Sequence, residues 1–117
     1  MRRPKPSPCI TDEEARGWIR TLPCLLGHVH ECVGRVQCCH VSHGVCHDDP
    51  ENMWPGCAEA HLEHHAIGTR LFNERYGVKL AEVARALWRI FVHGQDFLGD
   101  EIEDLYPKPG GPDGADA

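Results

Sequence analysis

Two histidines four residues apart, His61 and His65, are the residues of this sequence best placed to hold a metal ion. On a helix, side chains at positions i and i+4 lie on one face a turn apart, so both imidazoles can reach one cation. The apolar face of the same helix would consist of Ala60, Ile67 and Leu71, so the histidines are not needed to make it amphipathic. The pattern therefore favours a metal site over core packing.

Other residues of this helix bear on which kind of metal site the two histidines could form. Gly68 and Phe72 fall on the histidine side of the helical wheel, and Gly68 would leave that face open. Glu63 lies two residues after His61, on the opposite side of the helix, where it cannot act as the base of an H-E-x-x-H site. The spacing therefore argues against a zinc peptidase.

Cysteine and histidine are unusually frequent, with seven and nine in 117 residues, and they cluster between Cys24 and His65. An odd number of cysteines without a secretion signal disfavours a closed disulfide framework and favours metal binding. The alternative is a set of buried thiols and surface imidazoles. Several histidines are expected in loops or at the surface, namely His30, His43, His47, His64 and His93.

Helical periodicity and capping residues predict the elements that position these side chains. Thr11 and Glu14 have capping-box spacing, which predicts a helix to about Leu22, before Pro23. Further helices are expected over 58–76, ended by Gly77, over 79–92, ended by Gly94, and over 100–105.

Two short strands are expected between the first and second helices. One covers about Arg35–Val41, its partner is weaker, and a loop through Gly44 to Asn52 separates them. Loops of this length in small domains are usually functional. The expected fold class is α+β.

Composition sets the boundaries of the domain. We expect a flexible basic N-terminus over 1–10, one domain over 11–106 and a disordered tail over 107–117. No apolar run is long enough to cross a membrane, and a cytoplasmic location is expected. The net charge of −6 argues against a passive nucleic-acid binder, although much of the acidity follows Gly94: Asp96, Asp100, Glu101, Glu103, Asp104, Asp113 and Asp116.

A strand ending in His40, a loop with Asn52 five residues before Cys57, and a helix carrying His61 follow one another in this order. The arrangement resembles the HNH, or ββα-metal, endonucleases, and the spacing of His61 and His65 resembles that of the colicin-type members. A resemblance over about residues 18–90 is to phage and prophage recombination-associated HNH-like nucleases. It rests on Trp18–Cys24, Gln37–Val41, Pro55–Cys57, His61, His65–Gly68, Phe72 and Tyr76–Val78.

The resemblance implies a small ββα-metal core with a short N-terminal helix and a C-terminal packing helix. It implies a phage-encoded enzyme that hydrolyses DNA phosphodiester bonds in the host cytoplasm with a divalent cation, Mg, Mn, Ni or Zn. His40 would be the general base, and Asn52 would orient it by tying the loop to the strand. His61 and His65 would hold the cation, with Asp49 or Asp48 as third ligand; Cys39 stands where many members have a ligand.

Many members of this group also carry a structural zinc on two C-x2-C pairs. Here Gly27 and Ala60 replace the second cysteine of each pair, so the site would be rebuilt or lost. The candidate zinc ligands are Cys24, Cys32 and Cys57, with Cys38 or His28 as the fourth.

Three arginines, Arg70, Arg85 and Arg89, are candidates for contacts with DNA phosphates. The alternative for Arg85 and Arg89, which share a helix face, is an ordinary solvated face. Two alternatives to the nuclease stay open. One is a non-catalytic zinc-binding ββα adaptor for nucleic acid or protein, and the other is an unrelated zinc-stabilised interaction domain.

Overall fold

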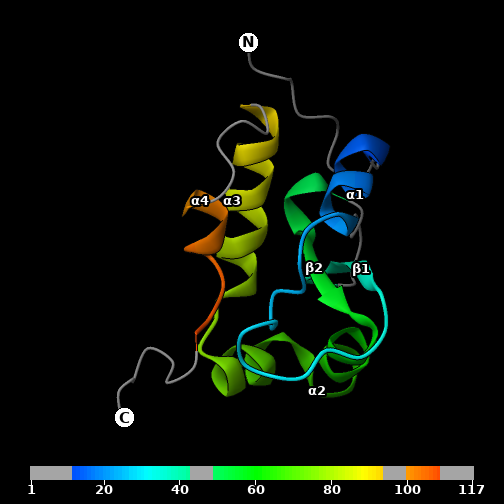
Figure 1. Cartoon of the computed structure of the whole chain (residues 1–117), viewed down its shortest axis with the longest axis vertical. Helices are drawn as coiled ribbons and strands as arrows, with labels where there is room; N and C mark the ends of the chain where they lie inside the picture. Colours follow the sequence, from blue (N-terminus) through cyan, green and yellow to red (C-terminus); the bar gives the residue numbers. More distant parts are fainter. Residues whose placement is uncertain (1–11, 43–48, 94–99, 109–117) are drawn as a thin grey trace.

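A computed structural model of the chain describes residues 12–42, 49–93 and 100–108. The elements follow the order α1 (Glu13–Arg20), β1 (Val36–His40), the 3-10 turn η1 (Pro50–Asn52), β2 (Met53–Cys57), α2 (Ala58–Tyr76), α3 (Leu80–Val92) and α4 (Asp100–Glu103) (Figure 1). The expected α+β fold class is confirmed, with an antiparallel pair of strands leading directly into a helix. The domain boundaries stay predictions, because residues 1–11 and 109–117 lie outside the described part of the chain.

The sheet is formed by β1 and β2, whose register pairs Val36 with Cys57 and His40 with Met53. Paired residues of antiparallel strands point to the same face, and successive residues alternate between faces. Trp54 therefore marks one face of the sheet, where its ring lies 5.5 Å from that of His64 and 5.3 Å from that of Phe72 in α2. Elements α1 and α3 also contact the sheet.

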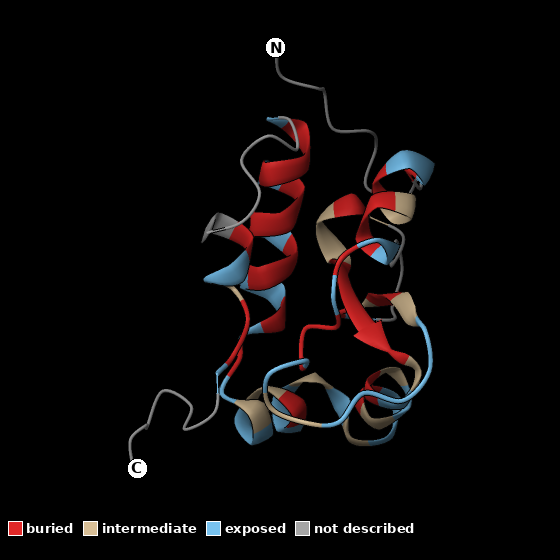
Figure 2. Ribbon diagram, viewed as in Figure 1, coloured by how far each residue is buried: buried red, intermediate tan, exposed pale blue. Residues whose placement is uncertain are grey.

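The weaker of the two predicted strands is the more deeply buried. All five residues of β2 are buried, whereas β1 is buried only at Cys38 and Cys39 (Figure 2). Proline and glycine in the middle of β2 weaken its sequence signal. The backbone of β2 nevertheless forms hydrogen bonds along both of its edges. Leu25 N–H donates to Pro55 O at 2.9 Å on one edge, and β1 pairs with the other.

Helix α1 begins one residue later than the sequence indicates. Asp12 is the N-cap, and its side chain accepts a hydrogen bond of 3.0 Å from Ala15 N–H. The predicted N-cap, Thr11, lies outside the described residues, and the helix ends at Arg20 rather than Leu22. Aspartate is as good an N-cap as threonine, so two adjacent candidates could not be separated by type.

Helix α2 has the predicted bounds and the left-handed Gly77 at its end, but Gly68 interrupts it with φ 86° and ψ 166°. The single helical wheel is therefore wrong beyond Gly68. Leu71, expected on the packed face, is 44% exposed, while Phe72 is fully buried. Gly68 changes the direction of the chain, which the uniform rotation of a wheel cannot represent.

His64 is buried, contrary to the expectation of a surface histidine. Its Nε2 lies 2.8 Å from Thr69 Oγ1, and that hydroxyl donates to Val41 O at 2.6 Å. Because the hydroxyl proton goes to the carbonyl, His64 Nε2 must be the donor to Thr69. This chain of bonds ties α2, on both sides of its kink, to the end of β1.

Gly34 stands where a side chain cannot be accommodated. It has φ 88°, and an added Cβ would lie 2.5 Å from the Cβ of Ala58. Gly34→Ala is expected to lower the free energy of unfolding by about 2–4 kcal/mol, from backbone strain and overpacking together. Urea denaturation measures the change.

The matched control is Gly68→Ala, because Gly68 shares the positive φ but an added Cβ meets nothing within 4 Å. It should lose about 1–3 kcal/mol less than Gly34→Ala, the difference being the steric part. Equal losses in the two variants would show that the contact with Ala58 is unimportant.

No helix in the described ranges combines the length and the apolar character needed to cross a bilayer.

Candidate metal centres

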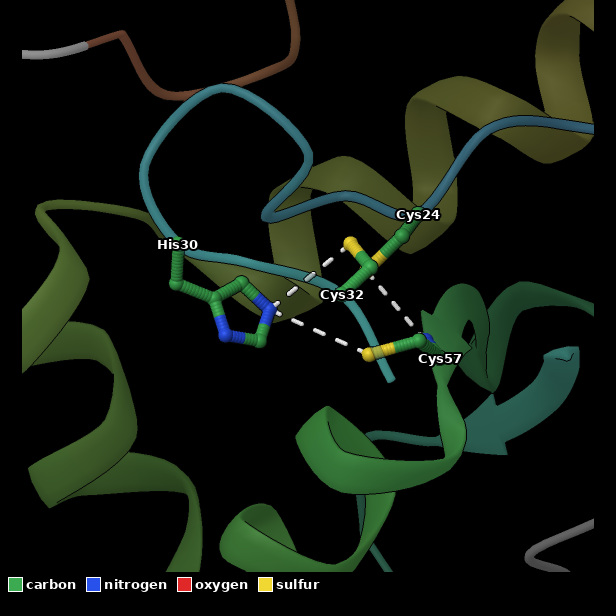
Figure 3. Close-up of side chains that lie close together, drawn as sticks. All are labelled: Cys24, His30, Cys32 and Cys57. Atoms are coloured by element: carbon green, nitrogen blue, oxygen red, sulfur yellow. Dashed lines mark hydrogen bonds between the residues drawn. The ribbon is translucent and has the colours of Figure 1, made fainter. Parts of the chain in front are cut away.

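Four side chains converge beside the start of α2: Cys24, His30, Cys32 and Cys57 (Figure 3). Their ligand atoms all lie within 4.8 Å of one another, and His30 Nε2 is 3.9 Å from the sulfurs of both Cys32 and Cys57. Tetrahedral zinc, with bonds of about 2.3 Å to sulfur and about 2.0–2.1 Å to nitrogen, separates its ligands by roughly 3.5–3.8 Å. A small contraction of this cluster would therefore enclose a metal ion, and three thiols with one imidazole are a donor set that suits zinc.

The chain brings these ligands together from two directions. Cys57 is the last residue of β2 and the N-cap of α2, and its backbone N–H donates to Cys24 Sγ at 3.2 Å. After Cys24 the chain turns tightly, since both Val29 N–H and His30 N–H donate to Leu26 O. Leu26 is fully buried, which anchors the turn so that it returns His30 and then Cys32 to the same place.

Hydrogen bonds and neighbouring thiols set the protonation of the cysteines. Burial works against ionisation of Cys57, but hydrogen bonds from the backbone of Ala60 and Val33 and from the thiols of Cys24 and Cys32 together lower its pKa. Burial raises the pKa of Cys24, and it raises the pKa of Cys32 to about 12 with a further contribution from Cys24. A divalent cation would favour deprotonation of all three thiols, because it replaces mutual repulsion with attraction.

The structure brings together the three cysteines expected to bind zinc, but the fourth member of the cluster is His30. His28, one of the two predicted alternatives, instead contacts Glu103 Oε2 at 2.7 Å. Cys38, the other, is a core residue of β1. The sequence signal for His30 is the spacing His30-x-Cys32, which does not have the usual C-x2-C form of a zinc knuckle.

A second group consists of the two histidines on α2 and a glutamine on β1. Nε2 of His61 lies 3.1 Å from Nε2 of His65, and Nδ1 of His61 lies 2.5 Å from Gln37 Oε1. His65 is exposed and His61 partly so, which leaves the pair accessible from solvent. The two imidazoles are thus close together, as the sequence predicts. The contact between Gln37 and His61 is not predicted from the sequence.

The predicted third ligand, Asp49, is not brought to this pair. Its side chain caps η1 by accepting a hydrogen bond of 2.9 Å from Glu51 N–H. Within residues 12–42, 49–93 and 100–108, the cysteine–histidine cluster is the only group of three or more such ligands. The alternative ligand, Asp48, lies outside the described residues.

Asn52 joins the two ends of the loop between the strands. Its Nδ2 donates to Ser42 O at 2.9 Å, its Oδ1 accepts from Ser42 N–H at 3.1 Å, and its own carbonyl accepts from Val41 N–H. These bonds hold the backbone next to His40, the last residue of β1. By strand alternation, His40 belongs to the sheet face opposite Gln37, and its Nε2 atom is buried there.

The three arginines are all exposed, but they do not form one basic patch. Arg70 and Arg89 line an open groove of about 820 Å³ between α2, α3 and residues 104–105, and Arg85 is not among its lining residues. Glu74 and Asp104 also line the groove, and Glu74 pairs with Arg70 at 3.3 Å. The groove therefore has mixed charge.

Comparison of the chain with family models, with curated proteins and with solved structures finds no match. Its function is therefore inferred from the motifs and from the geometry of the two sites.

Proposed function

We propose that this chain is a metal-dependent endonuclease of the HNH type that hydrolyses DNA phosphodiester bonds, with its divalent cation held by His61 and His65. The observation that carries the proposal is the 3.1 Å separation of the two Nε2 atoms. The other ring nitrogen of His61, Nδ1, contacts Gln37 Oε1. Two bonds of about 2.0–2.1 Å to one cation place nitrogens about 2.9 Å apart at a right angle and about 3.4 Å apart at the tetrahedral angle. The observed distance lies between these values.

The protein's own residues supply the proton transfer and the positioning. His40 takes a proton from a water molecule whose oxygen attacks phosphorus, and the bond to the leaving 3′-oxygen breaks as that oxygen takes up a proton from solvent. Asn52 keeps His40 in place by fixing the backbone that follows it. A bound cation supplies Lewis-acid stabilisation of the charge on the phosphate and the leaving oxygen.

The cysteine–histidine cluster has a different role in this proposal. It binds zinc with four protein ligands and therefore leaves no position for water or substrate, which is typical of a structural site. It would fix the loop over 24–32 to the start of α2, four residues before His61. The zinc site of the HNH-like nucleases would then be rebuilt, with His30 and Cys32 replacing the missing second cysteines.

DNA is the proposed substrate despite the net charge of −6, because a bound cation offsets part of the local repulsion. Phosphate contacts from Arg70 and Arg89 would add to affinity, which should fall as salt rises. The proposed setting is the cytoplasm of a host cell.

Nicking of supercoiled plasmid in Mg²⁺, Mn²⁺, Ni²⁺ or Zn²⁺ tests the proposal, with His40→Ala as the decisive variant. Loss of the general base should reduce the rate by about 100-fold or more. His93→Ala is the matched control, since His93 is an exposed histidine at the end of α3. Equal cleavage by the wild type and His40→Ala would exclude His40 as the general base. It would contradict the endonuclease proposal.

A second candidate, a non-catalytic zinc-binding adaptor for nucleic acid or protein, is favoured by two observations. His40 belongs to the strand face opposite Gln37, and Cys39 stands where HNH nucleases commonly have a ligand. Cys39 is fully buried, and burial raises its pKa further from neutrality, so its thiol is a poor ligand for an open site. A zinc-loaded, folded wild type that nicks no plasmid with any cation would support the adaptor.

A further inference from the structure

We infer that Gln37 is a positioning residue of the cation site, because its side-chain oxygen fixes the tautomer and ring orientation of His61. The inference rests on the proposed function in one respect: it takes His61 and His65 as the cation site. It does not require that the protein cleaves DNA. Gln37 Oε1 lies 2.5 Å from His61 Nδ1, joining the second residue of β1 to the first turn of α2.

The contact determines where the proton of His61 is. An amide oxygen can only accept a hydrogen bond, so Nδ1 must carry the hydrogen. A neutral imidazole has one N–H, so the lone pair of His61 is then on Nε2, the atom facing His65. A metal-binding histidine commonly donates its second ring N–H to an oxygen acceptor in this way.

The same logic describes the pair before and after a cation binds. Two Nε2 lone pairs 3.1 Å apart repel unless a proton or a cation lies between them. Without a cation, His65 can donate its Nε2 proton to His61. When a cation is bound, His65 would have to carry its proton on Nδ1 or be without one on Nε2, whereas His61 would keep the tautomer that Gln37 holds. His61 is therefore the preorganised ligand of the two.

Packing holds Gln37 in position. It is half-buried and stands opposite Gly56 in the sheet, which has no side chain of its own. An added Cβ on Gly56 would lie 2.6 Å from the ring of Trp54 and 3.0 Å from Cys39 Sγ. The Trp54 ring thus occupies the space over Gly56, the partner of Gln37, and the Gln37 amide contacts His61 of α2.

Isothermal titration of Ni²⁺ into the untagged, zinc-loaded chain tests this role without DNA. Gln37→Leu should weaken binding at the pair by about 10- to 100-fold, the usual effect of losing such an outer contact. Gln37→Glu, which also accepts at this position, should bind Ni²⁺ at least as tightly as the wild type. The His61→Ala variant supplies the baseline for other histidines, and zinc content of one per chain shows that each variant is folded.

A second readout would not respond to a merely structural role. Long-range nitrogen–proton NMR of the zinc-loaded chain without Ni²⁺ should show His61 as the Nδ1–H tautomer in the wild type and in Gln37→Glu, and a mixture in Gln37→Leu. Equal Ni²⁺ affinity in Gln37→Leu and wild type, or an Nε2–H tautomer in the wild type, would overturn the inference while leaving nuclease activity to be decided by plasmid nicking. Conversely, the expected Ni²⁺ and NMR results without any cleavage would overturn only the nuclease.

Discussion

Removal of zinc by a strong chelator is expected to unfold the chain, with loss of helical circular dichroism and of the cooperative thermal transition. Apparent binding free energies of structural zinc, about 10–16 kcal/mol, are as large as the whole stability of a typical small domain. In this chain the four candidate ligands join the segment that follows α1 to the junction of β2 and α2, so loss of a bound metal would release both.

Variants distinguish this effect from ordinary core damage. Cys57→Ala should abolish stoichiometric zinc binding in native mass spectrometry, whereas Cys38→Ala, at a buried cysteine outside the cluster, should keep one zinc and lose only about 1 kcal/mol. His30→Ala should weaken zinc binding and His28→Ala should not, since His28 contacts Glu103 instead. A chelated chain with an unchanged melting temperature would refute a structural zinc.

Replacement of both α2 histidines, His61→Ala with His65→Ala, is expected to reduce cation-dependent plasmid cleavage to background. Each single variant should lose about 100-fold or more, because a cation that supplies several kcal/mol of transition-state stabilisation accounts for at least that factor. Both side chains are wholly or partly exposed, so the fold and the zinc content should be preserved.

Leu62→Ala is the matched control for this experiment, since Leu62 lies on the same helix and is 72% exposed. Its cleavage rate and its cation requirement should equal those of the wild type. Full cleavage by the double histidine variant would mean that the cation of any nuclease activity is held elsewhere.

Sequence patterns were sufficient where local rules decide the structure. The bounds of α2 follow from its helical composition and from Gly77, whose left-handed conformation ends it. Leu80–Val92 was predicted almost to the residue because its apolar positions repeat at helical spacing and are in fact buried.

The sequence-based predictions fail where tertiary contacts determine the position of a residue. His64 resembles its neighbours in sequence, yet it is buried because Trp54 and Phe72 enclose it. Gly68 was interpreted as an opening on a continuous face, whereas it breaks the helix. His30 joins the cysteine–histidine cluster through a loop turn anchored by Leu26, and no periodic pattern in the sequence describes such a turn.

The measurement that bears most directly on the proposed function is anomalous diffraction from crystals of the zinc-loaded chain soaked in Mn²⁺ or Ni²⁺. We predict a zinc peak enclosed by Cys24, His30, Cys32 and Cys57, and a second peak of the soaked metal about 2.0–2.2 Å from Nε2 of both His61 and His65. A soaked metal found only at the cysteine cluster, with the two α2 imidazoles still in direct contact, would contradict a catalytic cation on this helix.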